Sequence, residues 1–370
     1  MSELRPYVVV LRSPSAIRVH PDETLEANIG TVENQVLLVI RTRYQTHESG
    51  GLVPREIWFH LMGEYESLEL AMEELSMRAS SVSAALAVAM NAGTDGLQVE
   101  LGIEVTEQDS PRAFFENALL DETGLPRSSR LLKIEPSLAF LRAISEHPRV
   151  DRLMRAASQY ELALRNWLPG QQVLALAHLY MAIEALTVVA REREVERAGS
   201  RQALLDEWGI ADLRDFDPAV RKRILFQGDS DAYTEAKSAS DSFEHGFGSM
   251  LDVRRRATDH RIATAGYVRE AILKLSGLDD ASRDLLMAAD LEFPKPSTRL
   301  AKYIRATLHG PGAELFTGPN GYPMFQLESS LDSLVNNPDG SFTYSPRESL
   351  TPTISPKMRF ENIRFEVWGP

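Results

Sequence analysis

The fold is decided by residues 173–190, which read VLALAHLYMAIEALTVVA. The only polar side chains in this stretch belong to His178, Tyr180, Glu184 and Thr187. A helix that is apolar on nearly every side lies in the centre of a helical bundle, because no face of it suits water. The stretch therefore predicts an all-α domain built around one central helix.

The rest of the region 111–290 is also helical in character. Pro136 suits the first turn of a helix, where a proline costs no hydrogen bond. The sequence predicts further helices over residues 150–167, 200–208, 218–225, 229–245 and 251–275. We therefore expect residues 111–290 to form one helical domain.

The region 1–110 mixes strand and helix signals. Val8–Leu11 and Val36–Ile40 are apolar runs rich in β-branched residues, which predicts buried strands. Ser67–Ala92 contains no proline or glycine, and its apolar residues recur at helical spacing up to a stop signal at Asn91. Gln98–Val105 alternates apolar and polar residues, as a half-buried strand does. This region is expected to form a small α+β unit.

The region 291–370 is too rich in proline for a long helix. Residues 337–340, Asn-Pro-Asp-Gly, predict a turn, and Asn362–Trp368 alternates like a last strand. We expect an irregular β-rich extension. Nine prolines precede the predicted last strand: Pro294, Pro296, Pro311, Pro319, Pro323, Pro338, Pro346, Pro352 and Pro356.

These three regions define the expected fold class. It is α+β, with a central all-α helical bundle (residues 111–290) flanked by an N-terminal α+β region (1–110) and a C-terminal β-rich extension (291–370).

Composition excludes several classes of function. The chain of 370 residues has no cysteine, which removes disulfides, zinc–thiolate sites and cysteine nucleophiles. Its net charge of −13 repels nucleic acid at long range, so RNA is a possible but not a favoured partner. The apolar run Tyr7–Leu11 is too short for a signal peptide, and no uninterrupted apolar stretch reaches membrane-spanning length. We expect a cytoplasmic protein without membrane contact, cofactor or metal.

Two stretches resemble the HEPN superfamily (higher eukaryotes and prokaryotes nucleotide-binding), and within it the Apea-like branch. The first is residues 174–186, a buried helix with one acidic residue, Glu184. The second is residues 236–246, which read AKSASDSFEHG and precede a long final helix. In the family, an arginine, four to six residues and a histidine fall near the start of the last helices, often as Arg-Asn-x-x-x-His-Gly. The resemblance covers roughly residues 135–276.

The resemblance implies a site and a reaction. Active members of the family are metal-independent ribonucleases that work as dimers, in which the histidine is a general acid or base and the arginine stabilises charge on the phosphate. A buried acidic residue on the earlier helix orients these groups. In this sequence His245 takes the histidine place, Asp241 the asparagine place and Glu184 the acidic place, but the arginine place falls on Ser240. Serine cannot supply a fixed positive charge.

A rival placement of the motif uses the next helix. Arg255 and His260 have four residues between them, and Arg254 and His260 have five, so both pairs match the spacing. The densest basic cluster lies in the same segment. It consists of Arg254, Arg255, Arg256 and Arg261, and it either holds a phosphate or forms a solvated helix face.

Each candidate also has a structural interpretation. His245 followed by Gly246 can cap the C-terminal end of a helix, where a positive histidine is favoured. Glu184 needs a partner or a cleft, because burying an unpaired carboxylate is costly, and Tyr180 and Thr187 lie on its side of the helix.

Three functional hypotheses follow. The first is a non-catalytic HEPN-like protein that acts through protein–protein contacts or self-assembly, as a homo-oligomer such as a dimer, and the missing arginine favours it. The second is a metal-independent endoribonuclease of a stress or phage-defence system that uses His245 or His260. The third is a structural or assembly protein of a phage or bacterial particle. A shared fold does not by itself carry a function.

Overall fold

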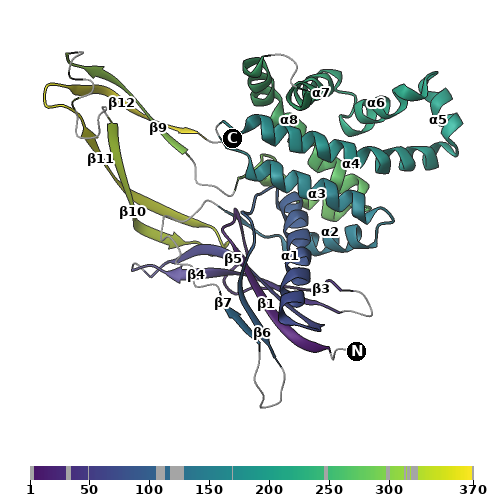
Figure 1. The fold of residues 1–370 in the computed structure, drawn as a ribbon, viewed down its shortest axis with the longest axis horizontal. Helices are drawn as coiled ribbons and strands as arrows, with labels where there is room; N and C mark the ends of the chain where they lie inside the picture. The colour runs from purple at the N-terminus through teal and green to yellow at the C-terminus, as the bar shows by residue number, and fades with distance from the viewer. Residues whose placement is uncertain are drawn as a thin grey trace. The chain divides into compact units, whose positions relative to one another are not determined.

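A computed structural model describes residues 4–30, 35–48, 50–105, 113–116, 129–168, 170–245, 249–296, 301–311, 314, 317 and 324–368. It confirms the α+β class, with a helical middle and a β-rich C-terminal part (Figure 1). The chain forms two compact units. The first contains Met1–Arg43, Glu56–Ala118 and Ser128–Thr298, and the second contains Tyr44–Arg55, Leu119–Arg127 and Arg299–Pro370. The first two predicted regions thus contribute mainly to one unit, and the division into three domains stays a prediction.

The first unit begins with a six-stranded sheet in the order β3-β4-β5-β1-β6-β7. Tyr7, Val9 and Leu11 of β1 are buried under helix α1, which confirms the predicted first strand. Strands β2 and β8 form a separate parallel pair. The strands are β1 (Arg5–Ser13), β2 (Ile17–Arg18), β3 (Leu25–Asn28), β4 (Leu37–Thr46), β5 (Leu52–Tyr65), β6 (Gln98–Glu104), β7 (Phe114–Glu116) and β8 (Arg130–Leu131).

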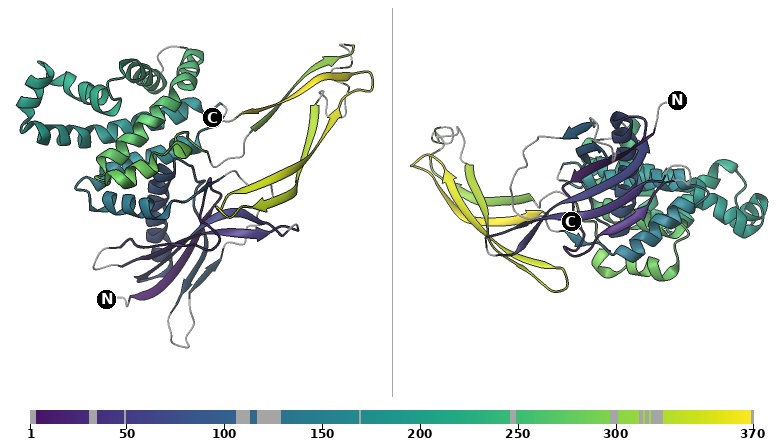
Figure 2. Two further views of the ribbon diagram at one scale, coloured as in Figure 1. Left: turned by 180° about the vertical axis from the view of Figure 1, so that it is seen from behind. Right: turned by 90° about the horizontal axis from the view of Figure 1, so that it is seen from below.

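Helix α1 (Leu68–Met90) is shared by the two cores of this unit. Leu75 and Ala79 belong to the core under the sheet, whereas Ala85 and Val88 belong to the core of the helical bundle. Figures 1 and 2 show α1 running from the sheet into the bundle. The Ser67 side chain caps its first turn by accepting a hydrogen bond from an amide of that turn.

The helical part is organised around α4, as the apolar stretch predicts. Residues of α4 pack against α3, α7 and α8, and Leu179, Ile183 and Leu186 are fully buried. Among the described residues, α4 is long and apolar enough to cross a membrane, but most of it is buried inside the bundle, which is compatible with a soluble protein. The helices are α2 (Ile134–Glu146), α3 (Val150–Arg165), α4 (Gln172–Ala198), α5 (Arg201–Trp208), η1 (Leu213–Asp215), α6 (Phe216–Val220), the π-helix η2 (Arg221–Leu225), α7 (Ser230–His245), α8 (Met250–Leu275), α9 (Asp280–Leu286) and η3 (Ala289–Leu291).

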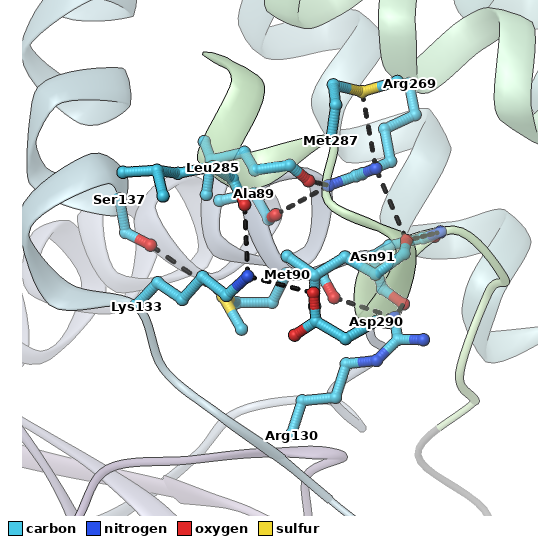
Figure 3. A network of polar contacts seen from close by, with 12 residues as sticks. Ala89, Met90, Asn91, Arg130, Lys133, Ser137, Arg269, Leu285, Met287 and Asp290 are labelled. Carbon is cyan, nitrogen blue, oxygen red and sulfur yellow. Dashed lines mark hydrogen bonds and ion pairs between the residues drawn. The ribbon is translucent and has the colours of Figure 1, made fainter. Parts of the chain in front are cut away.

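The C-terminal end of α1 is held by the side chain of Arg269 on α8 (Figure 3). Arg269 is 2% exposed and donates hydrogen bonds to the backbone oxygens of Val88 and Ala89, at 2.8 and 2.9 Å, and to that of Leu286. The last carbonyls of a helix have no amide partner inside it, and they favour positive charge. Burial lowers the pKa of Arg269 to about 10, so the guanidinium stays charged at neutral pH.

Asn91 and Arg130 complete this helix end. Asn91 is the C-cap, with a left-handed φ of 46°. Its Nδ2 donates to the backbone oxygen of Leu291 at 2.8 Å, and its Oδ1 accepts from the Tyr160 hydroxyl at 2.5 Å. The Arg130 guanidinium donates to the backbone oxygens of Met90 and Asn91. Groups from β8, α3 and the segment after α9 therefore meet at one point of α1.

The second unit contains two antiparallel ribbons of two strands each among the described residues (Figure 2). Strands β9 (Ala301–His309) and β12 (Arg359–Trp368) form one, and β10 (Met324–Asn336) and β11 (Phe342–Thr353) form the other. The predicted last strand lies in β12. Residues 337–340 form the predicted turn between β10 and β11.

The ribbons are longer and more regular than the prolines of this region led us to expect. Pro346 and Pro352 both lie inside β11, opposite Leu331 and Phe325 of β10. A strand at the edge of a sheet tolerates proline where the missing N–H would face outward. A two-stranded ribbon consists only of edge strands, so these prolines are compatible with a long pairing.

Candidate functional site

The candidate site is built on the polar residues of the central helix. Tyr180, Glu184 and Thr187 are spaced four and three residues apart, so they follow one face of α4. The resemblance implied that the carboxylate of Glu184 is buried, and this is corrected by the structure, in which its side chain is 52% exposed. The expected partner exists: Nη2 of Arg221 lies 3.7 Å from Oε1 of Glu184.

Arg221 contacts three of the four polar side chains of the apolar stretch. Its Nε donates to Oγ1 of Thr187 at 3.0 Å and its Nη1 donates to the Tyr180 hydroxyl at 3.2 Å. The guanidinium carbon also lies 5.7 Å from the centroid of the Tyr180 ring. The hydroxyl of Thr187 in turn donates to the backbone oxygen of Ile183 at 2.7 Å. The positive charge of Arg221 is thus held by a carboxylate, two hydroxyls and a ring.

Local backbone structure brings Arg221 to α4. It is the first residue of η2, a π-helical turn of the kind that often occurs at functional sites. Val220, directly before this turn, and Leu225, its last residue, are buried in the bundle core, and they fix the turn against α4. The sequence predicted a helix over residues 218–225 but not this wider turn.

Tyr180 is the most perturbed titratable group of the cluster. Burial raises its pKa to about 12, and Arg221 opposes part of that rise. Tyr233 and Asp241 of α7 raise the pKa further. At neutral pH the hydroxyl is therefore protonated, and it can donate a hydrogen bond to an acceptor.

Asp241 and His245 follow one another on α7. Asp241 forms an ion pair with Lys237 one turn earlier. His245 is the last residue of α7 and is exposed, one turn or about 6 Å beyond Asp241. That position agrees with the capping interpretation, while Gly246 lies outside the described residues. Ser240, at the arginine place of the motif, is a buried residue with 2% of its surface exposed.

The rival pair is separated by the geometry of α8. Residues 250–275 form one continuous helix, so Arg255 points about 140° away from His260 around the helix axis. Arg255 is exposed and lies 3.9 Å from the carboxylate of Asp252, whereas His260 is half-buried. The structure does not bring these two side chains together.

The four arginines of the basic cluster face different surroundings. Arg254 is exposed, and Arg256 is bound to α7 through Glu235 at 3.1 Å and Ser238 at 2.7 Å. Arg261 is buried, with its guanidinium carbon 4.8 Å from the centroid of the Trp167 indole. Burial lowers the pKa of Arg261. Together with the exposed Arg255, these residues do not form one phosphate-sized patch.

The chain matches no family model, and neither the curated proteins nor the solved structures contain a match to it. In the part of the chain that the structure describes, no three histidine, aspartate or glutamate side chains are grouped so that they could hold a metal ion. The likeness to the HEPN superfamily rests on the residues quoted above and stays a prediction.

Sequence reasoning missed Arg221. Its segment, Arg221-Lys-Arg223, carries an ordinary basic signal and lies 37 positions after Glu184 in the chain. The available signal was a carboxylate on an apolar helix, for which a cation from elsewhere in the bundle is a favourable partner even though the side chain is 52% exposed. That signal predicts the existence of a partner and not its position.

Replacing Arg221 by methionine is expected to lower the free energy of unfolding by about 2 kcal/mol, because the hydroxyls of Tyr180 and Thr187 lose a charged donor in a buried setting. Arg214→Met is the matched control, since the Arg214 side chain is 92% exposed and should change stability by less than about 0.5 kcal/mol. Urea unfolding measures both variants. Equal losses in the two would contradict a structural role for Arg221.

Proposed function

We propose that this is a non-catalytic, HEPN-like protein of the cytoplasm that acts through protein–protein contacts, first of all with a second copy of itself. The observation that carries the proposal is the β10–β11 ribbon. In the described part of the chain, β10 pairs with β11 alone. A ribbon of only two strands is marginally stable in water, and an open strand edge is a template for pairing with another chain.

The ribbon has one edge that suits pairing and one that does not. Pro346 and Pro352 have no N–H, so the ladder with β10 is intact only if their nitrogens face the outer edge of β11. Proline at an edge prevents another strand from pairing there. Strand β10 contains no proline, and its residues opposite the prolines, Leu331 and Phe325, present their N–H groups outward. The outer edge of residues 325–331 of β10 is therefore the pairing edge, because Asn336 at the end of the strand already bonds to the backbone of Leu52.

The surroundings of this ribbon support a contact function. Strand β11 is exposed along most of its length, and Val335 of β10 is 60% exposed. Ile363 on the other ribbon is 43% exposed. Single exposed apolar residues are common on protein surfaces, so the strand edge and not these side chains carries the proposal.

The state of the motif supports a non-catalytic role. The place of the family's arginine is held by the buried Ser240, and the nearby Arg221 is engaged by Glu184, Thr187 and Tyr180. These partners hold the guanidinium on α4, away from the arginine place of the motif on α7. A catalytic cation works best when it is preorganised and aimed at the reacting group.

One observation favours the ribonuclease as a second candidate. The Tyr180 hydroxyl accepts a hydrogen bond from Arg221, Asp241 raises the pKa of this phenol, and His245 follows Asp241 by one turn of α7. A ribonuclease site of this kind would take its cation from η2 and its acid and histidine from α7.

Self-association through β10 is tested with two proline substitutions that face each other across the ribbon. Ser329 and Glu348 are paired in the ladder, and by alternation both N–H groups face outward. We expect the wild-type protein to dimerise in sedimentation velocity, Ser329→Pro to weaken the dimer at least about tenfold, and Glu348→Pro to leave it unchanged, because that edge already carries prolines. A wild-type protein that stays monomeric at high concentration, or equal effects of both variants, would contradict the proposal.

Catalysis is tested separately with mixed-sequence RNA in the presence of EDTA. We expect no cleavage by the wild-type protein, because no free guanidinium faces His245 from the arginine place of the motif. Cleavage that persists in EDTA and disappears in His245→Ala and Arg221→Met would establish the ribonuclease instead. Loss of cleavage in His260→Ala alone would locate the site on α8.

A further inference from the structure

A cavity of about 510 Å³ lies in the first unit, where the end of β3 meets α1, α2 and α3. Its volume falls within the range of about 300–1,000 Å³ that is typical of small-molecule sites. Ile29, Val82, Leu141 and Met154 are among the apolar side chains that line it. The cavity is thus larger than a packing defect and has walls from four separate elements.

The cavity occurs at the junction between the two cores. Leu141 of α2 packs against both the core under the sheet and the core of the bundle. Val82 is buried, whereas Ile29 and Met154 are only half-buried, because they face the cavity without filling it. An apolar wall that is left half-covered gains free energy when an apolar group fills the space beside it.

The charged groups at this cavity are positive among the residues that the structure describes. Arg78 of α1 and Arg142 of α2 line it, and none of the described lining residues is acidic, although the chain as a whole has a net charge of −13. Arg78 makes one long hydrogen bond, from Nη1 to the backbone oxygen of Ile29 at 3.4 Å. Arg142 is exposed and forms no ion pair with any residue that the structure describes. Both guanidinium groups therefore retain donors for a ligand.

We propose that this cavity binds a small amphipathic anion, namely an alkyl carboxylate of medium chain length. The alkyl chain would lie against Ile29, Val82, Leu141 and Met154, and the carboxylate would accept hydrogen bonds from Arg142 and Arg78. Arginine suits this role because its planar guanidinium matches the two oxygens of a carboxylate. The described part of the lining has apolar walls and two cations and no acidic side chain, and this chemistry favours an amphipathic anion over a cation or a neutral sugar.

Binding at this place has a structural consequence. The ligand would contact β3, α1, α2 and α3 together, so it would connect the sheet core to the bundle core. A ligand that binds only the folded state raises the free energy of unfolding in proportion to the logarithm of its concentration. The site is separate from the Tyr180–Arg221 cluster and does not rest on the proposed function.

The test is isothermal titration of the full chain with octanoate, decanoate and dodecanoate below their micelle concentrations. We expect saturable binding of one molecule per chain that tightens about fourfold for each added methylene group. Arg142→Ala should weaken decanoate binding about tenfold. Arg152→Ala is the matched control, since Arg152 is an exposed arginine of the neighbouring helix that does not line the cavity, and it should leave the affinity unchanged.

Two further measurements keep the test decisive. Ala27 lines the cavity on β3, so Ala27→Phe should fill part of it and weaken decanoate binding while leaving the thermal midpoint of the free protein within a few degrees. Decanol, which has the same chain without the charge, should bind at least about tenfold more weakly than decanoate. The proposal is overturned by the absence of saturable binding, by equal affinities in Arg142→Ala and the wild-type protein, or by decanol binding as tightly as decanoate.

Discussion

The buried guanidinium of Arg269 donates hydrogen bonds to carbonyl groups in the last turn of α1, which have no amide partner inside the helix. The Asn91 side chain accepts a hydrogen bond from Tyr160 of α3, and Arg130 of β8 donates to the Asn91 carbonyl, so both connect the helix end to these elements. One face of α1 packs under the sheet along its whole length, to Leu86 and Met90, and the other face of its C-terminal part packs in the bundle. The end of α1 therefore contributes to both cores of the first unit. The cavity between β3, α1, α2 and α3 is a consequence of the same junction.

The bundle uses its few polar groups in the same way. Tyr180 and Thr187 are buried on α4, where unpaired hydroxyls would be costly, and the guanidinium of Arg221 bonds to both and also lies 3.7 Å from the half-exposed Glu184. That arrangement stabilises the bundle and also occupies the cation that a phosphate would need. Under the proposed function, the bundle is a scaffold and the edge of β10, which pairs with no strand other than β11 in the described part of the chain, supplies the surface for another chain.

Periodic patterns in the sequence predicted most of the elements. The central helix, α1, β1 and β6 were expected because burial on one or all faces leaves a period that can be read directly. The length of the ribbons was not expected, because nine prolines argue against regular structure unless it is known that Pro346 and Pro352 lie at an outer edge. The partner of Glu184 and the carbonyls held by Arg269 were not predictable, since both depend on contacts between residues far apart in the chain. Local patterns carry no information on such pairs.

The role of the α1 end is tested most directly by native-state hydrogen exchange on Asn91→Gly. Glycine accepts the left-handed φ of this position, so the variant removes only the side-chain bonds to Tyr160, Leu291 and Glu292. We predict that the slowest amides of the sheet and of the bundle lose protection together, by about 3 kcal/mol. Gln227→Gly, a second left-handed position with one exposed side-chain bond, should leave both unchanged. Loss of protection in the bundle alone, with the sheet unaffected, would contradict the view that this helix end joins the two cores.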